Sequence, residues 1–237
     1  DYREAGDSDN FEYFVEYGKA NSSSAKPAIL LVGGAEGGTV GEDAATAWFL
    51  KQANQGDYLV LRCGRVGRQA QWITDNYVDL INSAAELSID SREAANNPKV
   101  QEILRYEDYW EGTATEDAIN YLINDKKIPV GGTSAGMAIL GDYYYAPYNQ
   151  GLLSSEILDN PFHDNTQDIF HSNFLKVPYL KNVITDTHLD RRNDNHPETR
   201  YGRIFGLMAR IMIVENHQVY GIGLEEGAFV AIDENGI

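Results

Sequence analysis

The sequence predicts an α/β fold: a mainly parallel sheet with helices on both faces and a β-richer C-terminal half. Segments typical of strands and helices alternate, with short Gly or Asp turns between them, as in parallel sheets. Residues 28–32 are apolar throughout, which is typical of a strand buried on both faces. After Asn149 the chain changes to loops and β-like runs. We therefore expect one α/β domain.

The elements follow from local patterns. The apolar run 28–32 ends at Gly33-Gly34, an Ala- and Trp-containing stretch precedes Gly56, and apolar residues at i, i+3 and i+4 mark a helix near residue 120. Helices are expected at 43–54, 73–85, 115–124 and 134–140. Strands are expected at 28–32, 58–61, 86–89, 128–132, 183–185, 210–214, 219–222 and 229–232.

The domain boundary is placed by composition. Residues 1–16 carry six acids against one base, and residues 21–24 are polar without packing side chains. We expect an acidic lead-in and linker over 1–26 and a single catalytic domain over 27–237. A chain of 237 residues with 43% hydrophobic residues is large enough to bury a core.

Charge and composition exclude several classes of function. The 36 acidic and 19 basic residues give a net charge of −17, which argues against binding to nucleic acid. A single cysteine, Cys63, rules out an internal disulfide and a cysteine-based zinc cluster. No apolar run approaches the roughly 20 residues that cross a bilayer, and no signal peptide opens the chain. The compartment stays open because the first residue, Asp1, is not methionine.

The most informative stretch is 130–137, where Gly132, Ser134 and Gly136 form G-x-S-x-G between a predicted strand and a predicted helix. Such a turn exposes a nucleophile on strained backbone with small neighbours. We predict that Ser134 is a nucleophile and that the backbone amide of Ala135 stabilises an oxyanion. The alternative is a serine that only caps the following helix.

A nucleophilic serine needs a base and an acid that orients the base. Of five histidines, His188 is the best candidate, because it follows an apolar strand, where open α/β sheets gather catalytic loops. Glu225 and Glu226 end another strand in a glycine-rich turn, although exposed acids are common in this chain. The order Ser, His, Glu differs from that of α/β-hydrolases and disfavours that fold.

Three segments together resemble cyanophycinase, a serine exopeptidase of the family that includes dipeptidase E. They are residues 131–137, the Asp186-Thr187-His188 run with arginines after it, and residues 221–226. The resemblance runs from about Ala28 to the C-terminus. It implies a class I glutamine amidotransferase-like fold, a flavodoxin-like three-layer sandwich, with serine in place of the usual cysteine.

The resemblance also implies roles. Ser134 would be the nucleophile, His188 the general base and Glu226 the orienting acid, with Glu225 as the fallback. The substrate would be cyanophycin, a β-linked Asp-Arg polymer cleaved to dipeptides through an acyl-enzyme, or other aspartyl dipeptides and peptides. No metal or organic cofactor is implied.

The predicted substrate-binding residues are Asp186, Arg192, Arg200 and Arg203. Arginine forks suit the aspartyl carboxylates of such a substrate. The alternative is that these arginines pair with the acids of this protein. Residues 194–199 form an apparent insertion among them.

The sequence departs from the family pattern in two places, and the second puts the exact substrate in question. The upstream Gly-Gly-Asp-Gln element is missing, and the chain near Tyr106-Glu107 reads as though a strand and its turn were cut out. We expect these residues to be missing from the sequence as given, because loss of a core strand beside the nucleophile is structurally implausible. Thr187 stands where cyanophycinases usually have glutamine.

Three other functions compete with this prediction. A catalytically inactive family member could bind a peptide or an acidic ligand. A metal could bind Asp186, His188, Asp190 and His196, but their spacing fits no known motif and the nearby arginines would repel a cation. A glutaminase is disfavoured because the elbow holds serine and Cys63 has no elbow around it. The oligomeric state is not fixed by the sequence, and a homodimer is one option.

Overall fold

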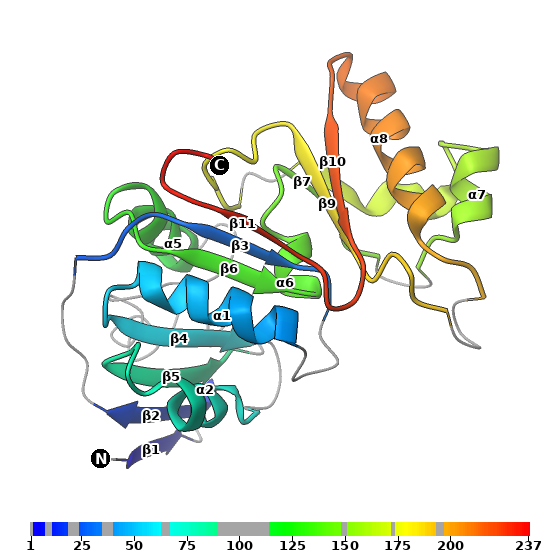
Figure 1. Ribbon diagram of the computed structural model, residues 1–237. Coiled ribbons are helices and arrows are strands. Elements are labelled where there is room, and N and C mark those ends of the chain that lie inside the picture. The colour runs from blue at the N-terminus through cyan, green and yellow to red at the C-terminus, as the bar shows by residue number, and fades with distance from the viewer. Residues whose placement is uncertain are drawn as a thin grey trace. The chain divides into compact units, whose positions relative to one another are not determined.

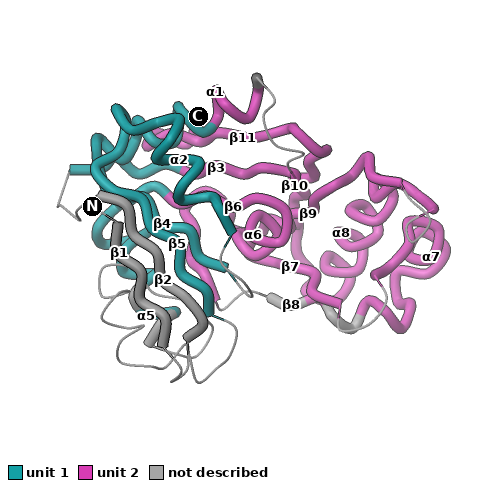
Figure 2. The backbone as a smooth tube through the Cα atoms, turned by 90° about the horizontal axis from the view of Figure 1, so that it is seen from below, with its two compact units in different colours: residues 1–28, 46–129 teal, residues 29–45, 130–237 magenta. Residues whose placement is uncertain are grey.

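The computed structural model describes residues 2–7, 11–18, 24–34, 40–62, 67–89, 114–147, 151–171, 174–192 and 197–237 (Figure 1). The chain divides into two compact units (Figure 2). Unit 1 comprises residues 1–28 and 46–129, and unit 2 comprises residues 29–45 and 130–237. Both units combine strands with helices, so the mixed α/β class is confirmed.

Unit 1 holds a four-stranded sheet in the order β1-β2-β5-β4. Its strands are β1 (Tyr2–Asp7), β2 (Phe11–Gly18), β4 (Asp57–Arg62) and β5 (Ser83–Ser88), and its helices are α2 (Gln69–Tyr77) and α5 (Ala114–Asn124). Only β4 and β5 pair in parallel; the other two pairs are antiparallel. Leu50, Ala70, Ile73, Ile81 and Ala84 form its buried apolar cluster.

The expected lead-in over residues 1–26 differs from the structure. Residues 2–7 and 11–18 form a β-hairpin, and β2 pairs with β5 from Tyr13 opposite Ser88 to Gly18 opposite Ser83. In the run 11–17, aromatic residues or valine stand at positions 11, 13, 15 and 17, and glutamate stands at positions 12 and 16 between them. The acidic composition obscured this period-2 strand pattern, which Phe14 interrupts.

The expected helix 73–85 is confirmed only as far as Tyr77. Helix α2 ends at Tyr77, and β5 begins at Ser83. Every residue of β5 is buried, and Asp57 on β4 accepts hydrogen bonds from the side chains of Asn82 and Ser83. Pairing with a distant strand therefore overrides the local helix pattern.

Unit 2 holds two small sheets, in the orders β11-β3-β6 and β10-β9-β7-β8. The strands are β3 (Ile29–Val32), β6 (Val130–Thr133), β7 (Tyr143–Tyr145), β8 (Ile169–His171), β9 (Val183–Thr187), β10 (Tyr220–Leu224) and β11 (Phe229–Ile232). The helices are α6 (Ala135–Ala138), α7 (Ser154–Asp159), the short 3₁₀ helix η1 (Asp164–Asp168) and α8 (Tyr201–Glu215). Helix α1 (Val40–Gln52) begins in unit 2, and its residues from 46 onward belong to unit 1.

The expectation of a mainly parallel sheet is met in part. The pairs β3–β6, β7–β9 and β9–β10 are parallel, whereas β11 and β8 pair antiparallel at sheet edges. Among the described helices, none is both long enough and apolar enough to cross a membrane.

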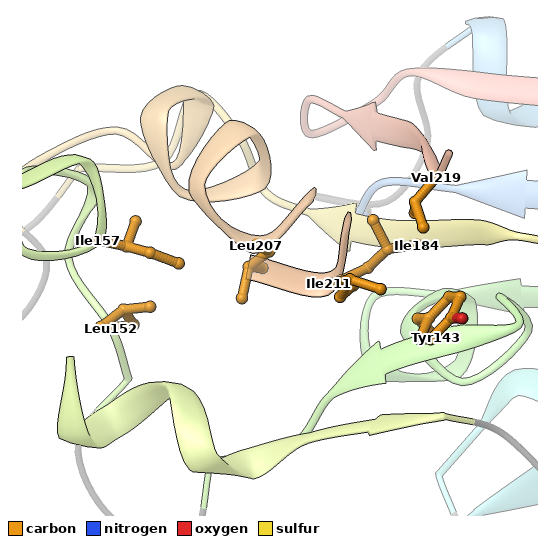
Figure 3. Packing of buried hydrophobic residues seen from close by; sticks show 7 residues of the cluster. All are labelled: Tyr143, Leu152, Ile157, Ile184, Leu207, Ile211 and Val219. Atoms are coloured by element: carbon orange, nitrogen blue, oxygen red, sulfur yellow. The ribbon is translucent and has the colours of Figure 1, made fainter. Parts of the chain in front are cut away.

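The core of unit 2 lies between helix α8 and strands β7 and β9 (Figure 3). Its buried residues are Tyr143, Leu152, Ile157, Ile184, Leu207, Ile211 and Val219. The run 210–214, expected as a strand, is the last part of α8. Ile204, Leu207 and Ile211 recur at i, i+3 and i+7 and are all buried, so burial of this stripe favours a helix over the local β-propensity of Ile and Val.

Candidate active site

The predicted catalytic residues lie at the carboxyl ends of strands in unit 2. Ser134 directly follows β6, His188 directly follows β9, and Glu226 lies two residues past β10. Strand β3, which pairs in parallel with β6, is followed directly by Gly33-Gly34. Open α/β sheets place ligand sites at this edge, so four loops of the chain converge where a site is expected.

Ser134 occupies a sharp turn between β6 and α6. Its backbone has φ 53° and ψ −122°, a conformation that costs a non-glycine residue on the order of 1–3 kcal/mol. The Ser134 N–H donates to the Val32 carbonyl at 3.0 Å and the Ser134 carbonyl accepts from Ala138 at 3.0 Å, which fixes the turn from both sides. A Cβ atom on Gly132 would lie 2.2 Å from the Gly136 carbonyl oxygen, so this position has no room for a side chain.

The Ser134 hydroxyl contacts His188. Ser134 Oγ lies 2.6 Å from His188 Nε2, and the Ser134 side chain makes no capping hydrogen bond to α6. The helix-cap alternative is therefore not what the structure shows. The side chain is directed to the predicted base instead.

His188 is held by its backbone and by its ring. Its N–H donates to the Gly33 carbonyl at 2.9 Å, and its φ is 54°. Among the other histidines with described side chains, His163 accepts from the Asn165 amide and His217 contacts the Tyr143 hydroxyl. Of the histidine side chains that the structure describes, only His188 lies beside Ser134.

The structure separates the two candidate acids. Glu226 Oε1 lies 2.6 Å from His188 Nδ1, and the Glu226 N–H donates to Asp190 at 2.9 Å. The Glu225 carboxylate instead accepts a hydrogen bond from the Tyr201 hydroxyl, a contact that raises the pKa of Tyr201 to about 12. Glu226 is thus the acid that contacts the imidazole.

The contacts of the His188 ring indicate which of its two nitrogens carries the proton in the neutral form. A carboxylate at Nδ1 requires a proton on that nitrogen, which leaves Nε2 to accept the Ser134 hydroxyl proton. The side chains of His188 and Glu226 are 14% and 23% exposed. A base that is shielded and yet reachable is what acyl transfer to a serine needs.

Sequence reasoning missed the role of Gly33 and Gly34. The Gly33 N–H donates to Ala228 at 3.0 Å, and the Gly34 carbonyl accepts from Gly227 at 2.7 Å. With the His188 contact, this glycine pair bridges the histidine and glutamate loops. The signal was present as a double glycine ending a strand, but its partners are distant in sequence.

The oxyanion donor remains a prediction. Ala135 directly follows Ser134 and is exposed, the position expected for such an amide. Helix α6 has only four residues, shorter than the expected helix 134–140, so a helix dipole contributes little here.

The predicted substrate-binding residues fall into two groups. Arg203 pairs with Asp186 through two hydrogen bonds of 2.5 and 2.9 Å, and both side chains are buried. This is the alternative in which an arginine pairs with an acid of the protein. Arg200 is partly buried and donates to the Thr187 carbonyl at 3.1 Å, and Arg192 is exposed. Burial, followed by the nearby charge of Arg203, lowers the pKa of Arg200.

The metal reading gains no support. Among described residues, no group of three or more His, Cys, Asp or Glu side chains is arranged to hold a metal ion. Asp186 and His188 contact different partners, Arg203 and Glu226. His196, Cys63 and the Tyr106-Glu107 junction lie outside the described residues.

Comparisons with known proteins add little. No protein-family model matches the sequence, and no curated protein shows significant similarity to it. A solved crystal structure of a peptidase from an acI-B1 Actinobacterium is similar, with 13% identity over 88% of this chain and 84% of that chain. Its TM-score of 0.48 is too low to assign a shared fold or function.

Proposed function

We propose that this protein is a serine peptidase of the cyanophycinase type. The observation that carries the proposal is the continuous contact from Ser134 Oγ to His188 Nε2 and from His188 Nδ1 to Glu226, both at 2.6 Å. The strained backbone of Ser134 supports it, since such strain concentrates at functional sites. The order of the three residues and the parallel strands that carry them fit a class I amidotransferase-like fold.

The proposed reaction has two halves. Ser134 Oγ attacks the carbonyl carbon of the scissile bond while His188 Nε2 takes the hydroxyl proton, and the resulting imidazolium is stabilised by Glu226. The tetrahedral oxyanion is met by the Ala135 amide, a contribution of about 10²–10³ in rate. His188 then gives the proton to the leaving amine, which departs and leaves an acyl-enzyme. Water, deprotonated by His188, attacks the ester, and the proton returns to Ser134 as the acid product leaves.

For the substrate we propose aspartyl or isoaspartyl peptide bonds, with cyanophycin first. The support is the resemblance of three sequence segments, together with arginines near the site. Arg200 and Arg192 are the cations proposed to meet a substrate carboxylate. Arg203 and Asp186 are not assigned this role, because their side chains form an ion pair with each other.

The test measures peptide release and serine reactivity together. The protein should release β-Asp-Arg from cyanophycin, and Ser134→Ala should release none. A carboxylate-free alkyl fluorophosphonate should label Ser134 in the wild type but not in Ser134→Ala, with exposed Ser155→Ala as the matched control. Labelling of Ser134 without release of β-Asp-Arg would mean that the substrate is a peptide other than cyanophycin. The absence of both labelling and release would overturn the proposal. It would favour an inactive relative that binds a peptide or an acidic ligand.

A further inference from the structure

A buried ion pair includes Asp186, two residues before the proposed base. The residues Asp186 and Arg203 are 5% and 7% exposed. Arg203 Nε donates to Asp186 Oδ2 at 2.9 Å, and Arg203 Nη2 donates to Asp186 Oδ1 at 2.5 Å. A two-pronged contact of this kind fixes the orientation of both groups, because the planar fork matches the carboxylate.

The pair connects helix α8 to the end of strand β9. Asp186 is the fourth of five residues in β9, two residues before His188. Asp186 Oδ1 also accepts the Thr187 N–H at 2.8 Å, and Arg200 donates to the Thr187 carbonyl at 3.1 Å. Both polar groups of the Thr187 backbone are therefore engaged by this arrangement, one residue before the imidazole.

The helix end of the pair is fixed as well. The Arg203 N–H donates to Ser154 Oγ at 3.0 Å, and the Ser154 hydroxyl donates to the Thr199 carbonyl at 2.5 Å. The first turn of α8 is thus tied to α7 and to the segment that precedes α8. The ion pair transmits this fixed position to the end of β9.

The burial of the pair makes a substrate role poor. A substrate carboxylate would have to displace Asp186 from a fork that is almost completely covered, leaving a buried acid without its partner. The charge of Arg203 is already balanced. His188, by contrast, has φ 54° and needs support from outside its own backbone.

We propose that Asp186 and Arg203 are positioning residues that hold the end of β9 so that His188 meets Ser134 and Glu226. The inference rests on the proposed function, because it takes His188 as the base. It reassigns two residues that the sequence resemblance placed in the substrate site. We call the Asp186–Arg203 pair in this role the brace. Because the brace positions the base, its loss should slow the reaction of Ser134 with every acyl donor, whatever the charge of that donor.

The experiment uses the carboxylate-free fluorophosphonate, which a carboxylate-binding arginine would not help to bind. Arg203→Lys keeps the charge but loses the fork, and Asp186→Asn loses the charge. A brace predicts labelling slowed by about 10- to 100-fold in each variant, since misplacement by about 1 Å can cost 10²-fold. Their combination should be no slower than the worse single variant. Arg210→Lys, on the same helix but stacked on Phe162, should label at the wild-type rate.

Folding is controlled by a second variant. Asp186→Leu with Arg203→Met replaces the pair by apolar side chains of similar size, a change that buried pairs often tolerate. Proton NMR of the His188 Nδ1–H reports its bond to Glu226 without any turnover. Slower labelling together with a weakened Nδ1–H signal is the expected result in this folded double variant.

Unchanged labelling and an unchanged Nδ1–H signal in the folded double variant would overturn the brace. A fall in cyanophycin release at unchanged fluorophosphonate labelling would return Arg203 to the substrate site and also overturn it. A wild type that the probe does not label would refute the proposed function itself. In that case the inference would fall for a different and recognisable reason.

Discussion

Gly34 lies against the imidazole of His188, and replacing it with alanine is a direct test of the proposed base. Gly34 has φ +148°, and a Cβ atom there would lie 2.3 Å from His188 Cε1 and 2.4 Å from Nδ1. Ordinary contacts begin near 3.4 Å. The ring or the Gly34 backbone must therefore move by about 1 Å to accept the methyl group.

The size of this movement sets the expected loss. The two hydrogen bonds of His188 are 2.6 Å long, and a displacement of about 1 Å takes them to the edge of the bonding range or beyond it. General base catalysis is worth about 10²–10⁴, and a 1 Å misplacement can cost about 10². We expect Gly34→Ala to lower kcat by about 10²–10³, with a smaller effect on KM.

The assay follows release of β-Asp-Arg and the rate of fluorophosphonate labelling in parallel. Thermal unfolding checks the fold, because a non-glycine residue at this φ costs about 1–3 kcal/mol. Gly41→Ala is the matched control: a Cβ on Gly41 would meet nothing closer than 3.8 Å. A folded Gly34→Ala protein that labels within threefold of the wild-type rate would refute the view that Gly34 seats the imidazole.

Further predictions concern the acid, a buried hydroxyl and alkaline stability. Glu226→Gln should slow labelling by about 10²–10⁴ and Glu225→Gln by less than about tenfold, because only Glu226 contacts the imidazole; equal losses would contradict this. Thr185→Val should lower the free energy of unfolding by about 1–2 kcal/mol in urea, because its hydroxyl bonds two carbonyls of α6. Burial, reinforced by the charge of Glu86, raises the pKa of Tyr58 to about 12. The stability that neutral Tyr58 contributes is complete below pH 10 and is lost toward pH 12, where it amounts to up to about 3 kcal/mol of unfolding free energy. Tyr58→Phe should therefore make the alkaline fall smaller, while the part that comes from Tyr201, whose pKa is also raised to about 12, stays.

The sequence predicted the nucleophile and base candidates because each carries a local signal. Ser134 lies in a motif whose backbone requirement is met within a few residues, and His188 directly follows an apolar strand. The structure brings both side chains within hydrogen-bonding distance. Their catalytic roles remain predictions to be tested by the variants above.

The choice between Glu225 and Glu226 could not be made from the sequence. Both residues lie past the end of β10, and Glu226 belongs to a turn, so the alternation of a strand does not decide which carboxylate faces His188. Which one faces His188 depends on the conformation of this turn and on the register of β10 with β9 that positions it, where Leu224 lies opposite Thr187. That register is a long-range property and leaves no mark in the local pattern.

Whether Arg203 faces the protein interior depends on helix α8, which the sequence did not predict. Because residues 210–214 are expected as a strand, the sequence does not show which side chains of the preceding segment face the interior. Once α8 begins at Tyr201, Arg203 falls on its buried side with Ile204 and Leu207, and Asp186 is within reach. An arginine in such a place needs a buried acid, and only the tertiary structure names it.

The backbone strain at Ser134 and His188 is balanced by hydrogen bonds from their own N–H groups. Ser134 and His188 both have positive φ, which neither residue type prefers. Each is held by a hydrogen bond from its own N–H to a carbonyl at the end of β3, Val32 for the serine and Gly33 for the histidine. Because the last residue of β3 and the residue directly after it fix both, their separation is set by a single peptide unit rather than by two independent loops. A change that weakens the end of β3 should therefore affect nucleophile and base together, whereas loss of the Asp186–Arg203 pair should affect the base alone.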